Sequence, residues 1–491
     1  MSNLLDKVLH SLGRRIRDPY VENLASKIQT MKSELAGDSA GAVSARAAIL
    51  VFLVRIISAI VTFALQVFLA RWMGIEQYGI FILVWVVAVM LGSMSCLGLQ
   101  TAVIRFITEY TAKNDIKYLK GIMLAAPIIA MLIATLVTLF TYFILFLFVD
   151  ENSSIVVLPL YLALLCLPFL ALEEIQEGIA RSFDMPMIAI GPAFVIRPAG
   201  ILMTMAIAYL LGFPANAMTA LSSAVIATFV STLIQSLILW LRIFKILGLK
   251  LPITNAIKLL DGNRLNIKFN FRYWFSIALP IFFASGFYGL LFNSDVILIG
   301  LMLGPESVAI YYAVLKSMAL IHFVHFAFRA ASTHHFSRFY SDNDIQGLSD
   351  FANKIAHWTF WPTLAIAIVT ILTGKYILML FGTTYVEAHY LLFILAAGIV
   401  LRATIGPIDA LLAMTGQQSV VMGVLAITLL SNVILNVSLI PEYGILGAAI
   451  ATSCVMFIET ALMHTAVSRK LGLSIFVFNF GSKPIDERYA I

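Results

Sequence analysis

Charged residues are scarce in this chain: they make up 12% of its 491 residues, about half the share that is usual in soluble proteins. Apolar residues make up 61%, against about 45–50% in an ordinary soluble protein. So few polar side chains could not cover the surface of soluble domains of this size, and no polar stretch is long enough to form a large catalytic domain. The composition therefore predicts an all-α membrane protein with many spans.

Cysteine is also rare, which excludes two kinds of site. The three cysteines, Cys96, Cys166 and Cys454, all lie within apolar runs and far from one another. A disulfide framework or a thiolate zinc site needs clustered, regularly spaced cysteines. We therefore predict three inert core residues, and we expect neither a metal site nor a cofactor.

Several motifs of enzymes and pumps are missing. The chain has no G-x-x-x-x-G-K-[ST] loop, so ATP-driven export by this chain alone is not expected. No paired carboxylates lie on a polar domain where a glycosyltransferase or hydrolase would need them, and the long outer loops of a polysaccharide polymerase are absent. The net charge of +6 is explained by basic loops on one side of the membrane, so no nucleic-acid partner is expected. The chain is predicted not to be an enzyme.

Twelve apolar segments are present, in two sets of six. Twelve spans need about 240 apolar residues at about 20 each, and the chain has roughly 300. The predicted organisation is a basic, amphipathic cytoplasmic tail (1–45), a first six-helix bundle (46–243), a basic cytoplasmic linker (244–272), a second six-helix bundle (273–468) and a cytoplasmic tail (469–491). Residues 4–35 fit either an amphipathic helix on an anionic membrane surface or a disordered basic tail.

The distribution of basic residues predicts the orientation. Of the 32 Lys and Arg residues, 26 lie in the two tails and the even-numbered loops, and the odd-numbered loops carry acids such as Asp150 and Glu306. Because cytoplasmic loops are enriched in Lys and Arg, both termini are predicted to be cytoplasmic.

The two halves of the chain resemble each other. Residues 73–84 (MGIEQYGIFILV) align with residues 303–314 (LGPESVAIYYAV), and each copy lies in the loop between the first and second span of its half. An even number of spans per half predicts a parallel repeat, with the two bundles arranged around a central cavity, as in transporters that rock between two states.

Three stretches resemble a known family: FLARWMGIEQYGIF with CLGLQTAVIRFITEY, NSDVILIGLMLGPESVAIYYA, and FGTTYVEAHYLLFILAAG with LNVSLIPEYGILGAAIAT. They are similar to polysaccharide-exporter flippases of the multidrug/oligosaccharidyl-lipid/polysaccharide exporter superfamily, and most of all to flippases of O-antigen and exopolysaccharide repeat units. The resemblance implies two six-helix bundles around a cavity and transport of an undecaprenyl-pyrophosphate-linked oligosaccharide. It places the protein in the bacterial inner membrane.

Seven ionisable residues lie within the apolar segments: Arg55, Arg197, Asp295, Lys316, Arg402, Asp409 and Glu459. Each would cost about 2.5–3.5 kcal/mol if it faced lipid, so we expect them to pair or to face a watery cavity. Polar stripes support the cavity, because Arg55 and Gln66 share a face of the first span and Asn432 repeats with Thr428 and Asn436 along the eleventh.

These charges lead to specific roles. Guanidinium groups bind phosphate oxygens in a bidentate fork, so Arg55, Arg197 and Arg402 are predicted to contact the pyrophosphate, with Gln66 and Asn432 also lining the cavity. Asp295 and Asp409 are predicted to couple transport to an ion or a proton. Interhelical hydrogen bonding is the structural alternative for each polar stripe.

Two other functions stay open at this point. One is a cation-coupled exporter of small amphiphilic drugs, which a cavity dominated by acids and aromatic residues would favour. The other is a scaffold of a polysaccharide synthase complex that transports nothing. The expected partners are the lipid-linked oligosaccharide and membrane lipids, with a polysaccharide polymerase and chain-length proteins as further candidates.

Overall fold

The computed structural model describes residues 40–148, 155–246 and 267–479. Within these ranges the chain forms helices and no strand. The chain divides into two compact units, Met1–Ser58 and Ala59–Ile491, and the helices from α4 onward all belong to the second unit. The amphipathic helix predicted for residues 4–35 lies outside the described residues.

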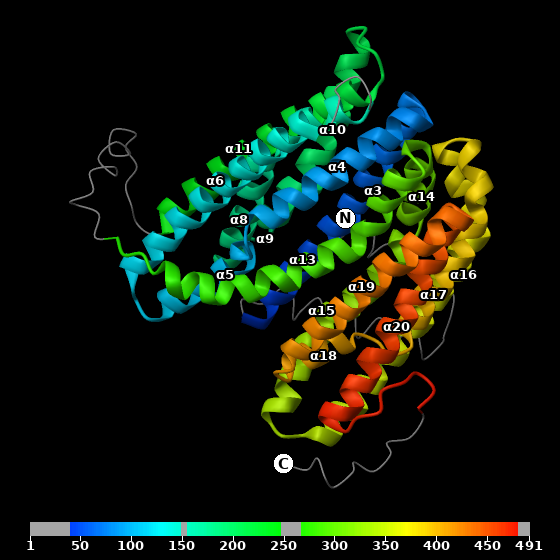
Figure 1. Ribbon diagram of the computed structural model, residues 1–491. Helices are drawn as coiled ribbons and strands as arrows, with labels where there is room; N and C mark the ends of the chain where they lie inside the picture. The colour runs from blue at the N-terminus through cyan, green and yellow to red at the C-terminus, as the bar shows by residue number, and fades with distance from the viewer. Residues whose placement is uncertain (1–39, 149–154, 247–266, 480–491) are drawn as a thin grey trace, which may run out of the picture. The chain divides into compact units, whose positions relative to one another are not determined.

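The first half contains both long helices, such as α6 and α11, and interrupted ones (Figure 1). In chain order they are α3 (Ala40–Met73), α4 (Ile75–Ser95), α5 (Leu99–Ala112), α6 (Ile116–Phe148), α7 (Val157–Leu164), α8 (Leu167–Ser182), α9 (Pro186–Gly191), the π-helical turn η1 (Pro192–Ile196), α10 (Arg197–Leu210) and α11 (Ala217–Ile246).

The second half follows the same plan. Its elements are α13 (Phe271–Met302), α14 (Pro305–Ser317), α15 (Ala319–Ser341), α16 (Ile345–Phe381), the 3-10 turn η2 (Thr384–Ala388), α17 (His389–Ala403), α18 (Ile408–Met414), α19 (Gln418–Tyr443) and α20 (Ile445–Leu471). In this half α17 and α19 both pack against α20 (Figure 1).

The number and order of the predicted spans are confirmed. Among the described residues, ten helical stretches are long and apolar enough to cross a membrane, and twelve if two bent pairs each count as one span. The bent pairs are α7 with α8, at 44°, and α14 with α15, at 48°. Six spans fall in each half, in the order that the apolar segments predict.

Some spans extend beyond the apolar segments. The second apolar segment of the sequence covers roughly residues 78–101, but helix continues through α5 to Ala112. Helix α5 buries Val103 and Phe106 on one side and exposes Arg105 on the other. A helix with one apolar stripe tolerates charges on its other face, so the first basic residue did not mark the end of the span.

The internal repeat appears in the backbone. Gly74 and Gly304 stand immediately before α4 and α14, with φ angles of 77° and 91°. L-residues with a side chain rarely adopt such angles, which explains the glycine in both copies. The helix that follows is interrupted in each half, between α4 and α5 in the first and at Met318 in the second. The parallel repeat predicted from residues 73–84 and 303–314 is thereby confirmed.

The two halves meet closely at the end of the molecule that the sequence predicts to be outside. A Cβ atom on Gly79 would lie 1.8 Å from the carbonyl oxygen of Pro305, so α4 and α14 approach too closely for any side chain there. The Arg71 guanidinium also donates to the carbonyl oxygens of Met379 and Leu380, at 2.6 and 2.7 Å. These carbonyls end α16 and lack helical partners, so Arg71 caps a helix of the opposite half.

Part of the predicted C-terminal tail packs against the second half, and one expectation about the cysteines needs correction. Residues 472–479 continue from α20 and pack onto the second half, where Val477 donates its N–H to the Thr404 carbonyl at 2.9 Å and its side chain is buried. Cys96 and Cys166 are buried as predicted, but Cys454 is exposed on α20. An apolar run in a membrane helix has a lipid-facing side as well as a core side, so placing Cys454 in the core was wrong.

Candidate functional site

A cavity of about 270 Å³ lies between the two halves. Helices α4, α5 and α8 form one wall and α13 and α14 the other, so the predicted central cavity between the bundles is confirmed. The lining residues are Trp85, Val86, Val89, Met90, Ser93, Met94, Gln100, Glu174, Phe282, Ser285, Gly286, Gly289, Asn293 and Tyr312. We call this the central cavity.

The lining of the central cavity is neutral and polar on an aromatic background. Its one charged side chain is Glu174, which accepts a hydrogen bond from the Ser93 hydroxyl at 3.0 Å. Neither Lys nor Arg is among the lining residues. The Gln100 Oε1 atom is buried and makes no hydrogen bond within the described chain. An unsatisfied buried acceptor costs free energy, so Gln100 can accept a hydrogen bond from a bound molecule.

Asp295 lies two positions after the cavity residue Asn293 on α13 and is buried. Its Oδ1 atom accepts hydrogen bonds from the amides of Asn432 and Asn436, at 3.0 and 2.8 Å. Its Oδ2 atom accepts from the hydroxyls of Thr452 and Tyr311, at 2.6 and 3.3 Å. Among the described residues from Ala59 onward, no Lys or Arg forms an ion pair with this carboxylate. Four neutral donors on α14, α19 and α20 hold it instead.

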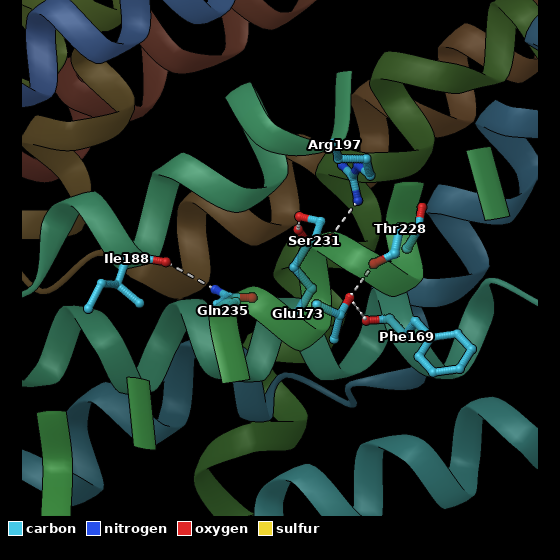
Figure 2. A network of polar contacts seen from close by, with 8 residues as sticks. Phe169, Glu173, Ile188, Arg197, Thr228, Ser231 and Gln235 are labelled. Atoms are coloured by element: carbon cyan, nitrogen blue, oxygen red, sulfur yellow. Dashed lines mark hydrogen bonds and ion pairs between the residues drawn. The ribbon is translucent and has the colours of Figure 1, made fainter. Parts of the chain in front are cut away.

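In the first half, Arg197 pairs with Glu173 inside the bundle (Figure 2). The Nη1–Oε2 distance is 2.7 Å, and Ser231 donates to the other carboxylate oxygen at 3.1 Å. The guanidinium also lies over the ring of Trp85, 5.7 Å from its centroid. Trp85 itself lines the central cavity. The π-helical turn ends immediately before Arg197, where Pro198 removes an N–H from the helix.

Neighbouring acids on α8 therefore have different surroundings. Glu173 is paired and buried, Glu174 lines the cavity, and Glu177 forms the i, i+4 ion pair with Arg181 that their spacing predicts. Deeper in the same bundle, the Gln235 amide donates to the Ile188 carbonyl at 3.2 Å (Figure 2). The polar side chains of α8 and α11 thus hold α9 and the start of α10 in place.

The second half contains two ion pairs between helices, of which the first is buried and the second has an exposed arginine. Arg402 on α17 pairs with Glu459 on α20, with 2.9 Å between Nη2 and Oε1. Arg329 on α15 pairs with Asp409 on α18, with 2.6 Å between Nε and Oδ2. These contacts agree with the expectation that charges within the spans pair with one another.

Gln66, a predicted site residue, and Lys316, a charged residue of the spans, both contact tyrosine side chains. Gln66 is buried and accepts a hydrogen bond from the Tyr78 hydroxyl at 2.9 Å. The Lys316 ammonium lies over the Tyr312 ring, 4.6 Å from its centroid. Arg55 is half-buried on the part of α3 that belongs to the Met1–Ser58 unit, and its role stays a prediction. None of the predicted site residues from Gln66 onward lines the central cavity.

The sequence analysis missed the residues that do line the cavity. Glu174 lies among the acids Glu173 and Glu177 near the end of an apolar segment, and Asn293 lies two positions before Asp295. Trp85, Gln100 and Tyr312 carry no charge, so a search for ionisable residues within apolar runs passed over them. A search for amides and aromatic residues near the interrupted helices would have found them.

Comparisons with known families give two overlapping matches. The model of the family described as "Polysaccharide biosynthesis protein" matches residues 44–338, more than half of the chain. The MatE model matches residues 280–438. A search of the curated proteins finds no match.

Solved structures share the fold at low sequence identity. An inward-facing multidrug resistance MATE transporter of the MOP superfamily has a TM-score of 0.67 at 14% identity, covering 84% of this chain and 94% of the other. The lipid II flippase MurJ, in an inward closed conformation, has a TM-score of 0.61 at 16% identity, covering 86% and 87%. A MOP superfamily transporter from Pyrococcus furiosus has a TM-score of 0.54 at 14% identity, covering 86% and 94%.

Proposed function

We propose, from the premise that the chain belongs to the polysaccharide biosynthesis protein family, that it moves a lipid-linked oligosaccharide between the leaflets of the bacterial cytoplasmic membrane. The observation that carries this proposal is the central cavity, which combines amides and hydroxyls with aromatic rings. Amides and hydroxyls both donate and accept hydrogen bonds, as sugar hydroxyls require. Aromatic rings provide rigid apolar surface for the faces of the sugar rings. The carrier that the family resemblance implies is undecaprenyl pyrophosphate.

We propose that Asp295 couples transport to a proton or a monovalent cation. Its carboxylate is buried among neutral donors, and the Oδ1 atom of the neighbouring Asn436 is buried without a hydrogen bond in the described chain. Rotation of that amide would turn an oxygen toward a cation. Asp409, the other predicted coupling residue, already has Arg329 as its cation, so it is the weaker candidate. Arg55, Arg197 and Arg402 stay predictions as pyrophosphate contacts.

Transport by purified protein in vesicles tests the function. We expect the wild-type chain to move a lipid-linked oligosaccharide to the opposite leaflet. Asn293→Leu should slow this movement roughly 10-fold, because a leucine cannot replace the hydrogen bonds of the amide. The matched control is Gln346→Leu, which removes an exposed amide outside the cavity and should leave the rate unchanged. A wild-type protein that moves no lipid-linked sugar would contradict the proposal and favour the scaffold.

A second candidate function is cation-coupled export of small amphiphilic molecules. The observation that favours it is the single carboxylate of the cavity, Glu174, beside Trp85, Phe282 and Tyr312, since aromatic faces and a carboxylate both attract cations. Glu174→Gln separates the two functions. An exporter of cationic drugs should lose efflux of a fluorescent cation in this variant, whereas a flippase should keep most of its movement of a neutral lipid-linked sugar.

The orientation in the membrane can be tested with reporter fusions. We expect fusions at Asp150 and Glu306 to report from outside the cytoplasm, and fusions near Lys258 and Lys483 to report from inside, because basic residues concentrate in the even loops and tails. A cytoplasmic signal at either acidic loop would overturn the arrangement of six spans in each half.

A further inference from the structure

A second hollow, of about 600 Å³, lies along the contact between α5 and α13. Its lining is Thr101, Ile104, Arg105, Thr108, Glu109 and Ile281. Thr101, Arg105 and Thr108 are at i, i+4 and i+7, so they share one face of α5, and all three are exposed. We call this hollow the α5–α13 groove.

Arg105 in this groove makes no direct polar contact in the described chain, although its charge interacts with that of Glu109 one turn further along the helix. It lies within a candidate membrane span, Ile75–Ala112, yet it forms neither an ion pair nor a side-chain hydrogen bond among the described residues. The nearby carboxylate of Glu109 is taken by the Lys113 ammonium, at 2.7 Å, and by the Tyr273 hydroxyl, at 2.8 Å. An exposed arginine on a membrane span is costly unless it reaches an anion or water at the interface.

The groove opens beside a basic and aromatic surface at the end of the molecule that is predicted to be inside. The Lys268 N–H donates to the Lys117 carbonyl at 3.2 Å, which brings the start of α6 next to residues that precede α13. Phe269 and Phe271 are both exposed there. Lysines and aromatic rings together are typical of the interface where lipid headgroups lie.

The groove is also adjacent to the central cavity. Gln100 and Phe282 line the cavity. Their neighbours in the sequence, Thr101 on α5 and Ile281 on α13, line the groove. Between them the helices touch through their backbones: a Cβ atom on Gly98 would lie 2.2 Å from the Ala278 carbonyl oxygen. The contact between α5 and α13 therefore separates a groove that contains Arg105 and Glu109 from a cavity without Lys or Arg.

We infer that the α5–α13 groove binds the diphosphate of the lipid-linked cargo through Arg105, outside the central cavity, while the sugar alone enters the cavity. This inference rests on the proposed function and deepens it, since it assigns the two parts of the cargo to two different sites. Arg105 would supply two parallel donors to phosphate oxygens, and the hydroxyls of Thr101 and Thr108 lie on the same face. The other source of the same chemistry is the phosphate of an ordinary anionic membrane lipid.

Binding of a sugar-free polyprenyl diphosphate tests the inference. The full chain in phosphatidylcholine nanodiscs is titrated with a fluorescent geranylgeranyl diphosphate. We expect Arg105→Gln to raise the Kd roughly 10-fold. The Kd of Arg105→Lys should lie between those of the wild type and Arg105→Gln, because lysine keeps the charge but lacks the planar pair of donors. The matched control is Arg338→Gln at the corresponding end of α15, where the arginine is also exposed; its Kd should stay within about 2-fold of the wild type.

Competition separates the two sources of phosphate. We expect an equal amount of phosphatidylglycerol to leave the Kd unchanged; equal competition would overturn the inference in favour of a general headgroup site. Wild-type binding by Arg105→Gln, or no binding by the wild-type chain, would also overturn it. Because the probe carries no sugar, these results are independent of the vesicle assay: loss of the groove site with intact flipping would leave the proposed function standing. Intact probe binding without flipping would instead count against the function alone.

Discussion

Replacing Asp295 with asparagine is expected to lower transport at least about 100-fold while the protein reaches the membrane at normal levels. The side chains are nearly the same size, and the site offers neutral hydrogen-bonding groups on every side, so an amide can be accommodated. What the substitution removes is the negative charge and the ability to take up a proton. If that charge couples transport to an ion gradient, the vesicle assay with an imposed gradient should show almost no accumulation.

Thr452→Val is the control for this prediction. It removes the shortest hydrogen bond to the carboxylate, 2.6 Å, but leaves the charge, so transport should fall only about 2- to 10-fold. Wild-type transport by Asp295→Asn would make Asp295 a packing residue. Disappearance of this variant from the membrane would show instead that the carboxylate holds α13, α19 and α20 together.

Replacing Arg402 with methionine is expected to lower the free energy of unfolding by about 3–5 kcal/mol, the range found when one partner of a buried ion pair is removed. Arg402 and Glu459 are both largely buried, with side-chain exposures of 16% and 5%. Methionine replaces most of the apolar length of arginine, so the main effect is a carboxylate left in the bundle without its cation. Denaturant titration of the protein in detergent micelles measures the change in the free energy of unfolding.

The double variant Arg402→Met, Glu459→Gln should recover most of that loss, since the charge without a partner is then removed as well. The exposed pair of Arg338 and Asp342 provides the control: Arg338→Met should change the free energy of unfolding by about 0–1 kcal/mol. If the double variant is no more stable than Arg402→Met alone, the ion pair is not the reason for the loss. Arg402 would then be stabilised by other contacts, and its predicted role in binding pyrophosphate would gain weight.

The sequence by itself determined the spans, their number and the division into halves. Whether a segment crosses a membrane depends on the length of its apolar run, which is a local property, and the twelve segments agree with the helices one by one. The aligned copies at residues 73–84 and 303–314 similarly predicted equivalent positions in the two halves, and the glycine of each copy meets the local requirement for a positive φ angle. The i, i+4 spacing of Glu177 and Arg181 also predicted their ion pair.

Only the tertiary structure decided which charges meet and which residues line the cavity. Asp295 receives hydrogen bonds from residues 137 and 141 positions away, and the partners of Arg402 and Asp409 lie on other helices. Such pairings depend on how each helix is rotated and packed, which apolar periodicity in a membrane does not specify, since lipid and protein core are both apolar. The ionisable residues within the spans were therefore predicted to line the cavity. In the structure, those after Gln66 contact other residues within the bundles instead. The cavity wall consists of Glu174 and neutral side chains, because these are the residues on the sides of α4, α8 and α13 that face one another in the packed structure.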